Sequence, residues 1–260
     1  MLDFSWKDTL AAIWRPKQNR LRPIYEMDIL GLDDLLGIEN QKLQMVQNTE
    51  QFINNKPFNH MLLWGARGTG KSSLIKAMLP CFQDKNLRIV EFFKEDLQDL
   101  PDVVDDLRTS SYKFIIFCDD LSFEVGDYSY KGLKPVLEGS IESPPRNIMI
   151  CATSNRRHLV SENISDNAQT KVAHGELHYG DMIEEKISLS DRFGLWLSFY
   201  HGSQNDYLEL VEHYFKDYKG DKEALYRDAK VFATMRASRS GRTAKQFYNA
   251  YCEQFLKGSD

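Results

Sequence analysis

Residues 60–73 read His-Met-Leu-Leu-Trp-Gly-Ala-Arg-Gly-Thr-Gly-Lys-Ser-Ser, and this stretch decides the fold. Its apolar residues 61–64 predict a short buried strand, and the pattern Gly-x-x-x-x-Gly-Lys-Ser follows at residues 65–72. Residues 73–79 have helical spacing, and we expect this helix to end at Pro80. Strand, glycine loop and helix therefore follow one another in the order that a phosphate-binding loop requires.

The residue types in the loop suit a nucleotide. Its glycines allow backbone conformations that turn successive N–H groups toward a β-phosphate, and the next helix adds its positive end. Lys71 supplies a mobile charge for the β- and γ-phosphates, and the Ser72 hydroxyl can ligate Mg²⁺. A glycine-rich turn without a ligand is the alternative, which the flanking strand and helix disfavour. The expected nucleotide-binding residues of the loop are Gly65, Ala66, Arg67, Gly68, Thr69, Gly70, Lys71, Ser72 and Ser73.

The bulk composition narrows the protein class. The 260 residues are 42% hydrophobic and carry a formal net charge of −5, which argues against bulk non-specific binding to nucleic acid. No apolar run approaches the ~18 residues that cross a membrane, and residues 1–6 do not resemble a signal peptide. We expect a cytoplasmic protein without a membrane partner. Its four cysteines have no metal-binding spacing, so we expect buried thiols in a reducing compartment.

Two segments precede the loop. Residues 3–14 place large apolar side chains among polar ones, which predicts an amphipathic helix, and the basic residues 15–22 suggest a solvated linker or a contact with nucleic acid or an acidic partner. Residues 28–38 form an apolar turn ahead of a helix expected over 39–54. Either this turn covers the nucleotide base, or it caps the helix and fills the core. The candidate base-covering residues are Leu36, Gly37 and Ile38.

Two later strands end in polar residues. The expected third strand, 114–118, ends in Asp119 and Asp120, whereas the second, 87–93, leads into a helix over 94–108. Ligands collect at the carboxyl ends of parallel strands, so Asp119 is expected to hold Mg²⁺ through water and Asp120 to position or deprotonate the attacking water.

After a helix near 130–141, a fourth strand at 147–152 leads to Asn155, which either bonds the attacking water and the γ-phosphate or caps the next turn. The polar stretch 161–186 is expected to be a loop that sets partner or substrate specificity.

The last part of the chain is expected to contain helices alone after one more strand. A fifth strand is expected at 195–200, followed only by helices at 204–219, 221–237 and 241–257. We therefore expect an α/β fold, with a parallel five-stranded sheet flanked by helices and a small all-helical domain after it. The expected divisions are an N-terminal extension, 1–25, a nucleotide-binding α/β domain, 26–202, and a helical lid, 203–260.

These motifs in this order resemble the AAA+ ATPases over residues 28–258. The whole chain is similar to a bacterial group of that superfamily catalogued as domain of unknown function 815, notably at Leu62–Ser73 and Phe117–Glu124. The resemblance implies binding of ATP with Mg²⁺. It also implies that residues 65–72 are the Walker A loop and that Asp119 and Asp120 are the Walker B acids.

The resemblance implies three further roles. Asn155 matches the first sensor, and Arg242, early in the last helix, matches the second. Arg192, in Ser-Asp-Arg-Phe, matches an arginine finger that reaches the γ-phosphate of a neighbouring subunit and therefore requires an oligomer. Alternatively, Arg192 forms an ion pair within its own chain.

Two departures from the family pattern favour different functions. Many AAA+ proteins have Glu where this chain has Asp120, so hydrolysis is expected to be slow. The segment 92–96 lacks the glycine of a substrate-threading loop, which favours the initiator and helicase-loader branches. The first hypothesis is an ATPase that switches or remodels a partner. The alternatives are a low-turnover, ATP-loaded binding module or helicase-loader-like adaptor that docks on DNA or protein, and a small-molecule kinase.

Overall fold

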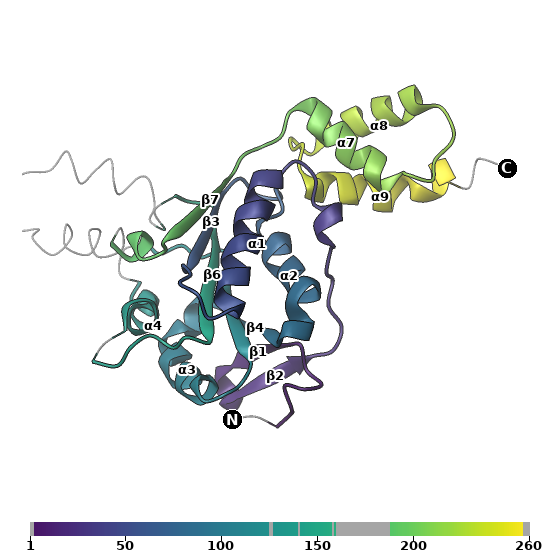
Figure 1. Cartoon of the computed structure of the whole chain (residues 1–260). Coiled ribbons are helices and arrows are strands. Elements are labelled where there is room, and N and C mark those ends of the chain that lie inside the picture. The colour runs from purple at the N-terminus through teal and green to yellow at the C-terminus, as the bar shows by residue number, and fades with distance from the viewer. Residues whose placement is uncertain (1–2, 125–126, 140, 158, 160–187, 257–260) are drawn as a thin grey trace, which may run out of the picture.

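The computed structural model describes residues 3–124, 127–139, 141–157, 159 and 188–256 (Figure 1). The predicted specificity loop at 161–186 lies outside the described residues. Among the described helices, none is long and apolar enough to cross a membrane.

One seven-stranded sheet forms the centre of the molecule, with strand order β2-β1-β4-β5-β6-β3-β7. Strands β1 and β2 pair antiparallel, and all other neighbours pair parallel. The predicted α/β class and its five parallel strands are confirmed, and the sheet has two strands more than expected. The strands are β1 (Ala11–Arg15), β2 (Arg20–Ile24), β3 (Met61–Gly65), β4 (Leu87–Phe92), β5 (Lys113–Cys118), β6 (Ile148–Ser154) and β7 (Leu195–Phe199).

The two extra strands come from the N-terminal extension, where the predicted helix over 3–14 and the predicted linker are wrong. Residues 11–14 are consecutively apolar and buried, because β1 lies between β2 and β4. The Trp14 ring stacks on Phe92, with 6.1 Å between ring centroids, and its Nε1 donates to Asp99 at 2.9 Å. Pro23 is tolerated because β2 is the edge strand. Tertiary pairing therefore decides the structure of this segment.

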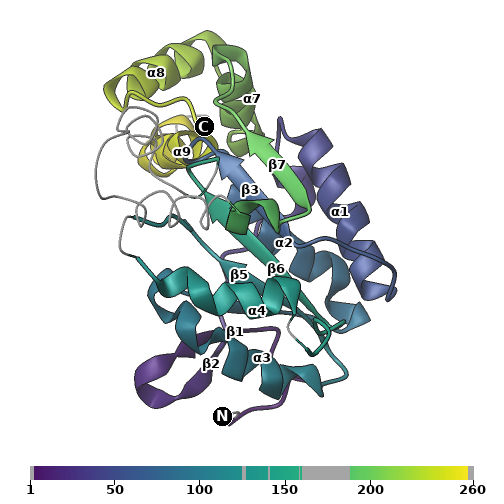
Figure 2. The same cartoon turned by 90° about the vertical axis from the view of Figure 1, so that its left-hand side faces the viewer.

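Helices cover both faces of the sheet. Helices α1 and α2 lie on one face and α3 and α4 on the other, as Figure 1 and Figure 2 show from two sides. Alternate strand residues supply the two cores, so Leu62 packs with the α3 side and Leu63 with the α2 side. The four helices are α1 (Glu39–Ile53), α2 (Lys71–Phe82), α3 (Leu100–Arg108) and α4 (Leu133–Glu138).

Two expectations about this region need correction. Helix α2 continues through Pro80 to Phe82, so the proline lies in its last turn and does not end it. Cysteines 118 and 151 are buried in β5 and β6, and burial raises the pKa of the Cys118 thiol to about 12, but Cys81 is exposed. The expectation of a buried thiol is therefore wrong for Cys81.

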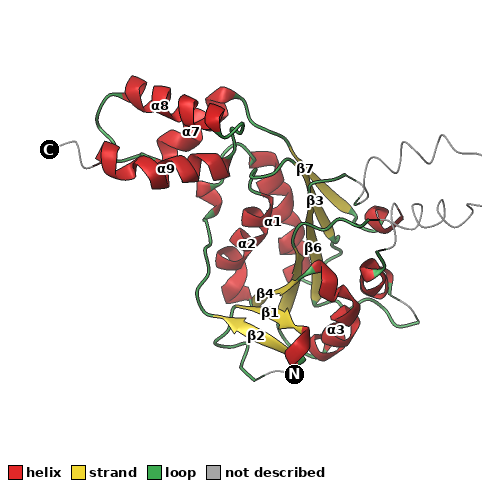
Figure 3. Ribbon diagram, turned by 180° about the vertical axis from the view of Figure 1, so that it is seen from behind, coloured by secondary structure: helices red, strands yellow, loops and turns green. Residues whose placement is uncertain are grey.

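Three helices follow the sheet: α7 (Gln204–Tyr214), α8 (Lys222–Met235) and α9 (Gly241–Leu256). They share a separate core that includes Tyr207, Phe215 and Phe247. Figure 1 shows this bundle beyond the ends of β3 and β7. We propose that the bundle is a lid domain beginning at residue 203. Figure 3 shows the segment between β2 and α1 running alongside α2 toward α9.

Candidate functional site

Strands β5, β6 and β3 are neighbours, and the chain leaves the carboxyl end of each with polar residues. Lys71 begins α2 after β3, Asp119 and Asp120 follow β5, and Asn155 follows β6. Because the strands run parallel, these side chains meet at one edge of the sheet. The structure thus brings together the predicted phosphate, metal and water-positioning groups.

The loop between β3 and α2 has the backbone that its glycines allow. Gly65, Gly68 and Gly70 have φ values of 125°, 75° and 95°. At Gly65 a Cβ would lie 2.0 Å from the Phe199 carbonyl oxygen, so the close approach of β7 requires glycine there. The Ala66 N–H donates to the same carbonyl at 2.9 Å and is therefore used by the sheet. The N–H groups in the first turn of α2 have no intrahelical acceptor, so this helix end can bind an anion.

Lys71 lies at the centre of the site and is only 7% exposed. Its ammonium group donates to the carbonyls of Gly65 at 2.8 Å and Ala66 at 2.6 Å, and to Asn155 Oδ1 at 3.3 Å. The Thr69 hydroxyl also donates to the Ala66 carbonyl, at 2.8 Å, which closes the loop around the lysine. These bonds hold the ammonium group at the mouth of the glycine loop.

Burial lowers the pKa of Lys71 below its usual value. Asp119 and Asp120 oppose this shift, and the charges of Arg242 and Arg67 add to it. Lys71 therefore lies between two carboxylates and two arginines, a mixed set of charges that suits a ligand carrying both phosphate and a metal ion.

The predicted metal ligands are in contact. The Ser72 hydroxyl donates to Asp119 Oδ1 at 2.6 Å, and the Thr153 hydroxyl donates to the same oxygen at 2.5 Å. Thr153 Oγ1 also accepts from the Asp120 N–H at 2.9 Å. A hydroxyl and a carboxylate beside a phosphate loop are the hard oxygen donors that Mg²⁺ takes, so the residues present fit this ion.

Asp120 and Asn155 form the predicted water-positioning pair. Asn155 Nδ2 donates to Asp120 Oδ1 at 2.5 Å, while its amide oxygen accepts from Lys71. Asp120 has a left-handed φ of 51°, a conformation that Asp tolerates better than most residues. The asparagine therefore connects Asp120 to Lys71.

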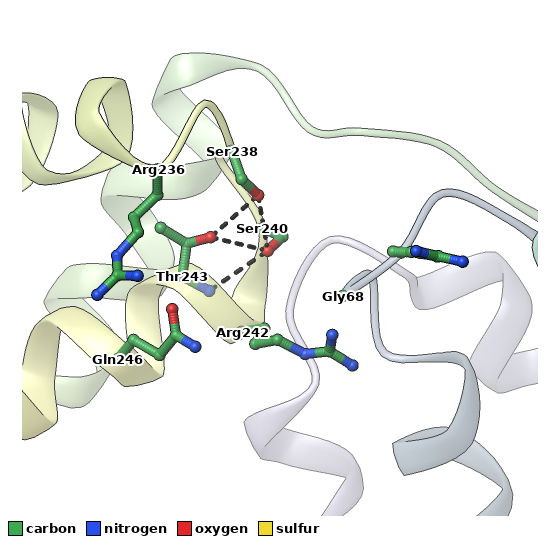
Figure 4. Close-up of a pocket in the computed structure, with 8 residues that line it drawn as sticks. Gly68, Arg236, Ser238, Ser240, Arg242, Thr243 and Gln246 are labelled. Atoms are coloured by element: carbon green, nitrogen blue, oxygen red, sulfur yellow. Dashed lines mark hydrogen bonds between the residues drawn. The ribbon is translucent and has the colours of Figure 1, made fainter.

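The lid closes one side of the loop. A cavity of about 170 Å³ lies between Gly68 and the start of α9, and Figure 4 shows Arg242 reaching across from α9 toward the loop. A Cβ at Gly68 would lie 2.7 Å from Ser240 Oγ, so loop and lid touch. The Ser240 hydroxyl is in turn bonded to Ser238 and Thr243, at 3.2 and 3.0 Å. Arg242 is thus placed beside the predicted phosphate position.

The predicted base-covering segment also lies against the loop. A Cβ at Gly70 would be 3.6 Å from Ile38 Cδ1 and 3.9 Å from Leu35 Cδ2, and both side chains are buried. Leu36 is partly exposed and Gly37, with a φ of 74°, is exposed. Of the three predicted residues, Ile38 is the one that lies against the glycine loop, at Gly70. Leu35 also lies there and was not predicted from the sequence.

Arg192 is not brought to this site. It precedes β7, which runs parallel to β3, so it lies near the amino ends of the strands while the phosphate loop follows their carboxyl ends. Its guanidinium group pairs with Glu138 and donates to the Ser188 hydroxyl at 2.9 Å. The alternative of an ion pair within the chain is therefore what this structure contains.

Thr153 is the main residue that sequence reasoning missed. It is 2% exposed and joins Asp119 to the backbone of Asp120. Only its place at the end of a strand next to the acid pair signals this role, and that requires knowing that β5 and β6 pair.

Comparisons with known proteins give a family and a fold. A family model described as Protein of unknown function (DUF815) matches residues 7–255. No curated protein matches the chain.

Among solved structures, the Holliday junction branch migration motor RuvB of Thermotoga maritima is 14% identical. That match covers 85% of this chain and 71% of RuvB, with a TM-score of 0.49. An alanine-to-serine variant of RuvB matches at the same identity and coverage, with a TM-score of 0.50, and at this identity the likeness concerns the fold alone. The chain belongs to the DUF815 family and has the fold of the AAA+ P-loop ATPases.

Proposed function

We propose that the protein binds ATP with Mg²⁺, hydrolyses it slowly, and uses the lid to switch or remodel a partner. One observation carries this proposal: Lys71, Ser72, Asp119 and Asn155 lie beside a glycine loop in one hydrogen-bonded chain, which Asp120 and Thr153 complete. Each group has a part in phosphoryl transfer, and they come from three separate strand ends. A structural ion-pair cluster has no need of a left-handed glycine backbone beside it.

Different residues of the chain bind the phosphates, activate the water and hold the metal ion. The first-turn N–H groups of α2 and the Lys71 ammonium group bind the β- and γ-phosphates. Asp120 orients the attacking water and accepts its proton, while the Asn155 amide holds the Asp120 carboxylate in place. Ser72 and Asp119 would hold Mg²⁺, which withdraws negative charge from the phosphates when bound. Arg242 contributes charge from the lid, so lid position and phosphate state are linked.

We propose that Arg192 acts on a neighbouring subunit. It stands before the five-residue strand β7, whose length is about 16 Å, whereas its own phosphate loop follows the other end of β3. An arginine at that edge reaches a triphosphate only on another copy of the chain, after leaving Glu138. The proposed assembly is therefore a homo-oligomer with shared sites.

A second candidate is an ATP-loaded binding module that docks on DNA or protein and turns over little. The Asp120 carboxylate favours it, because this acid is one methylene shorter than Glu and is already engaged by Asn155 at 2.5 Å. Tight ATP binding with negligible turnover would favour this candidate, if Asp120→Asn changes the turnover little.

ATP turnover per subunit, measured against protein concentration with and without single-stranded DNA, tests the proposal. Shared sites predict that turnover rises with concentration, and a flat dependence contradicts them. Stimulation by DNA would favour the loader-like adaptor.

A mixing experiment tests Arg192 directly. Arg192→Ala alone should lose about a thousandfold in turnover. Mixed with Lys71→Ala, it should regain activity, because the Lys71→Ala subunit still offers its arginine to the intact loop of the other. Arg227→Ala, an exposed arginine on α8, is the matched control and should retain full turnover. Absence of any gain on mixing would contradict an arginine acting between subunits.

A further inference from the structure

The cavity between the glycine loop and the lid has a lining that the proposed ATPase mechanism uses only in part. Its walls are three arginines, three residues with hydroxyl groups, one glutamine and one glycine. No carboxylate is found among these described residues, so the charges of the lining have one sign. Of the three arginines, the proposed mechanism uses Arg242 alone.

The three arginines, Arg67, Arg236 and Arg242, have no acidic partner. Among the described residues, none of the three forms an ion pair, in contrast to Arg108 and Arg192. All three are exposed, so their long side chains can turn toward a ligand. An anion that enters the cavity therefore meets positive charge that no carboxylate of the lining neutralises.

The hydroxyl groups form the floor between two of these arginines. Ser240 and Thr243 are 6% and 3% exposed, and their side-chain oxygens lie 3.0 Å apart. The Thr243 hydroxyl donates to Ser238 at 3.0 Å, and the Ser238 hydroxyl donates to Ser240 at 3.2 Å. Because these hydroxyls bond one another, the donors for an anion are the guanidinium groups and the amide of Gln246.

Arg236 and Arg242 lie on either side of this floor, as Figure 4 shows, with Arg242 on the side of Gly68. The Arg236 guanidinium group lies over the Phe232 ring, 5.3 Å from its centroid. Each guanidinium group can bind one phosphate group through two parallel bonds. Two arginines that stand apart in this way suit an anion with two linked phosphate groups better than a single phosphate.

We propose that this cavity binds inorganic diphosphate, with Arg236 at one end, Arg242 at the other, and Arg67 adding charge from the loop. A cavity of about 150 Å³ holds a molecule the size of benzene, so the volume of about 170 Å³ suits a free diphosphate ion and is too small for a nucleoside in addition. Binding at this site does not depend on hydrolysis beside Lys71.

The consequence of binding rests on the proposed ATPase. Arg67 belongs to the glycine loop, whereas Arg236 and Arg242 belong to the lid, so one diphosphate ion holds the lid against the loop. It also engages Arg242, the arginine that the lid offers to ATP. Diphosphate would therefore regulate the position of the lid.

Calorimetric titration of the full-length Lys71→Ala chain with inorganic diphosphate tests the site, because this variant lacks the phosphate-binding lysine of the loop. One diphosphate per chain should bind. Adding Arg236→Ala should weaken binding by about ten-fold or more, the effect of losing one charge-assisted contact. Arg239→Ala is the matched control, since it removes the same charge from an exposed arginine outside the cavity, and it should bind as the parent does.

Absence of binding to the Lys71→Ala chain would overturn the proposal, because diphosphate would then need the loop. Equal weakening by Arg236→Ala and Arg239→Ala would overturn it as well, and so would orthophosphate that binds as tightly as diphosphate. Lys71→Met replaces Lys71→Ala if the alanine variant does not fold. Since no nucleotide is used, a failure of the proposed ATPase leaves this test intact.

Discussion

The hydroxyl of Thr153 holds the two acids of the site, and its removal tests whether that geometry matters. Thr153→Val keeps the shape of the side chain but deletes the donor to Asp119 and the acceptor for the Asp120 N–H, at 2.5 and 2.9 Å. Because the residue is 2% exposed, water has little access to replace either bond. Among the described residues, the Asp119 carboxylate then keeps its bond from Ser72 and no other side-chain bond.

The expected cost is the loss of these two bonds. A hydrogen bond to a carboxylate contributes about 1.5–3 kcal/mol, and one between neutral groups about 0.5–1.5 kcal/mol. Thr153→Val should therefore lower the free energy of unfolding by about 2–4.5 kcal/mol. Thr153 orients a predicted metal ligand. The gain in ATP affinity that Mg²⁺ gives should therefore be about 10-fold smaller, or more, in the variant.

Urea unfolding and ATP titrations at several Mg²⁺ concentrations measure the two effects. Thr153→Ser, which keeps the hydroxyl, is the matched control and should retain the Mg²⁺ dependence. A valine variant with the wild-type unfolding midpoint and the wild-type response to Mg²⁺ would refute the reasoning about Thr153.

Two other perturbations have expected outcomes. Gly68→Ala should weaken ATP binding and lower the free energy of unfolding by about 1–2 kcal/mol, because φ is 75° there and the new Cβ meets Ser240. Gly37→Ala is the control for backbone strain alone, because φ is 74° there and nothing lies within 4 Å of the new Cβ. ATP titration of both variants measures the difference. Burial lowers the pKa of His60 from 6.5 to about 4, and its Nδ1 accepts from the Ile150 N–H at 3.0 Å. Unfolded His60 therefore binds a proton first, so its stabilising effect is complete above pH 6.5 and is lost as the pH falls toward 4. Urea unfolding should show a loss of about 2 kcal/mol between pH 7 and pH 5 that His60→Gln lacks; an equal loss in the variant would exclude His60 as the cause.

The sequence predicts those parts of the fold that depend on local pattern. The apolar runs of β3, β5 and β6 are typical of strands covered on both faces, and the glycine loop specifies the turn from β3 into helix α2. The N-terminal hairpin could not be recognised in this way. Phe4, Leu10, Ile13 and Trp14 fit a helical period, but pairing with β4 favours the strand.

In the candidate site, too, local motifs predict some residues, whereas others depend on how the strands pair. Lys71, Ser72, Asp119 and Asn155 are predicted by motifs, and the structure brings them into contact. Thr153 could not be assigned a role, because its two partners, Asp119 and Asp120, follow the neighbouring strand β5. The place of Arg192 depends on the direction of β7 relative to β3, which no local pattern specifies.

Calorimetric titration of the purified chain with ATP, with and without Mg²⁺, tests most directly whether the glycine loop and Asp119 form a nucleotide site. Wild type should bind one ATP per chain, more tightly with Mg²⁺, and Lys71→Ala should show no binding. A wild-type chain that ignores ATP, or a Lys71→Ala chain that binds it equally well, would contradict the account.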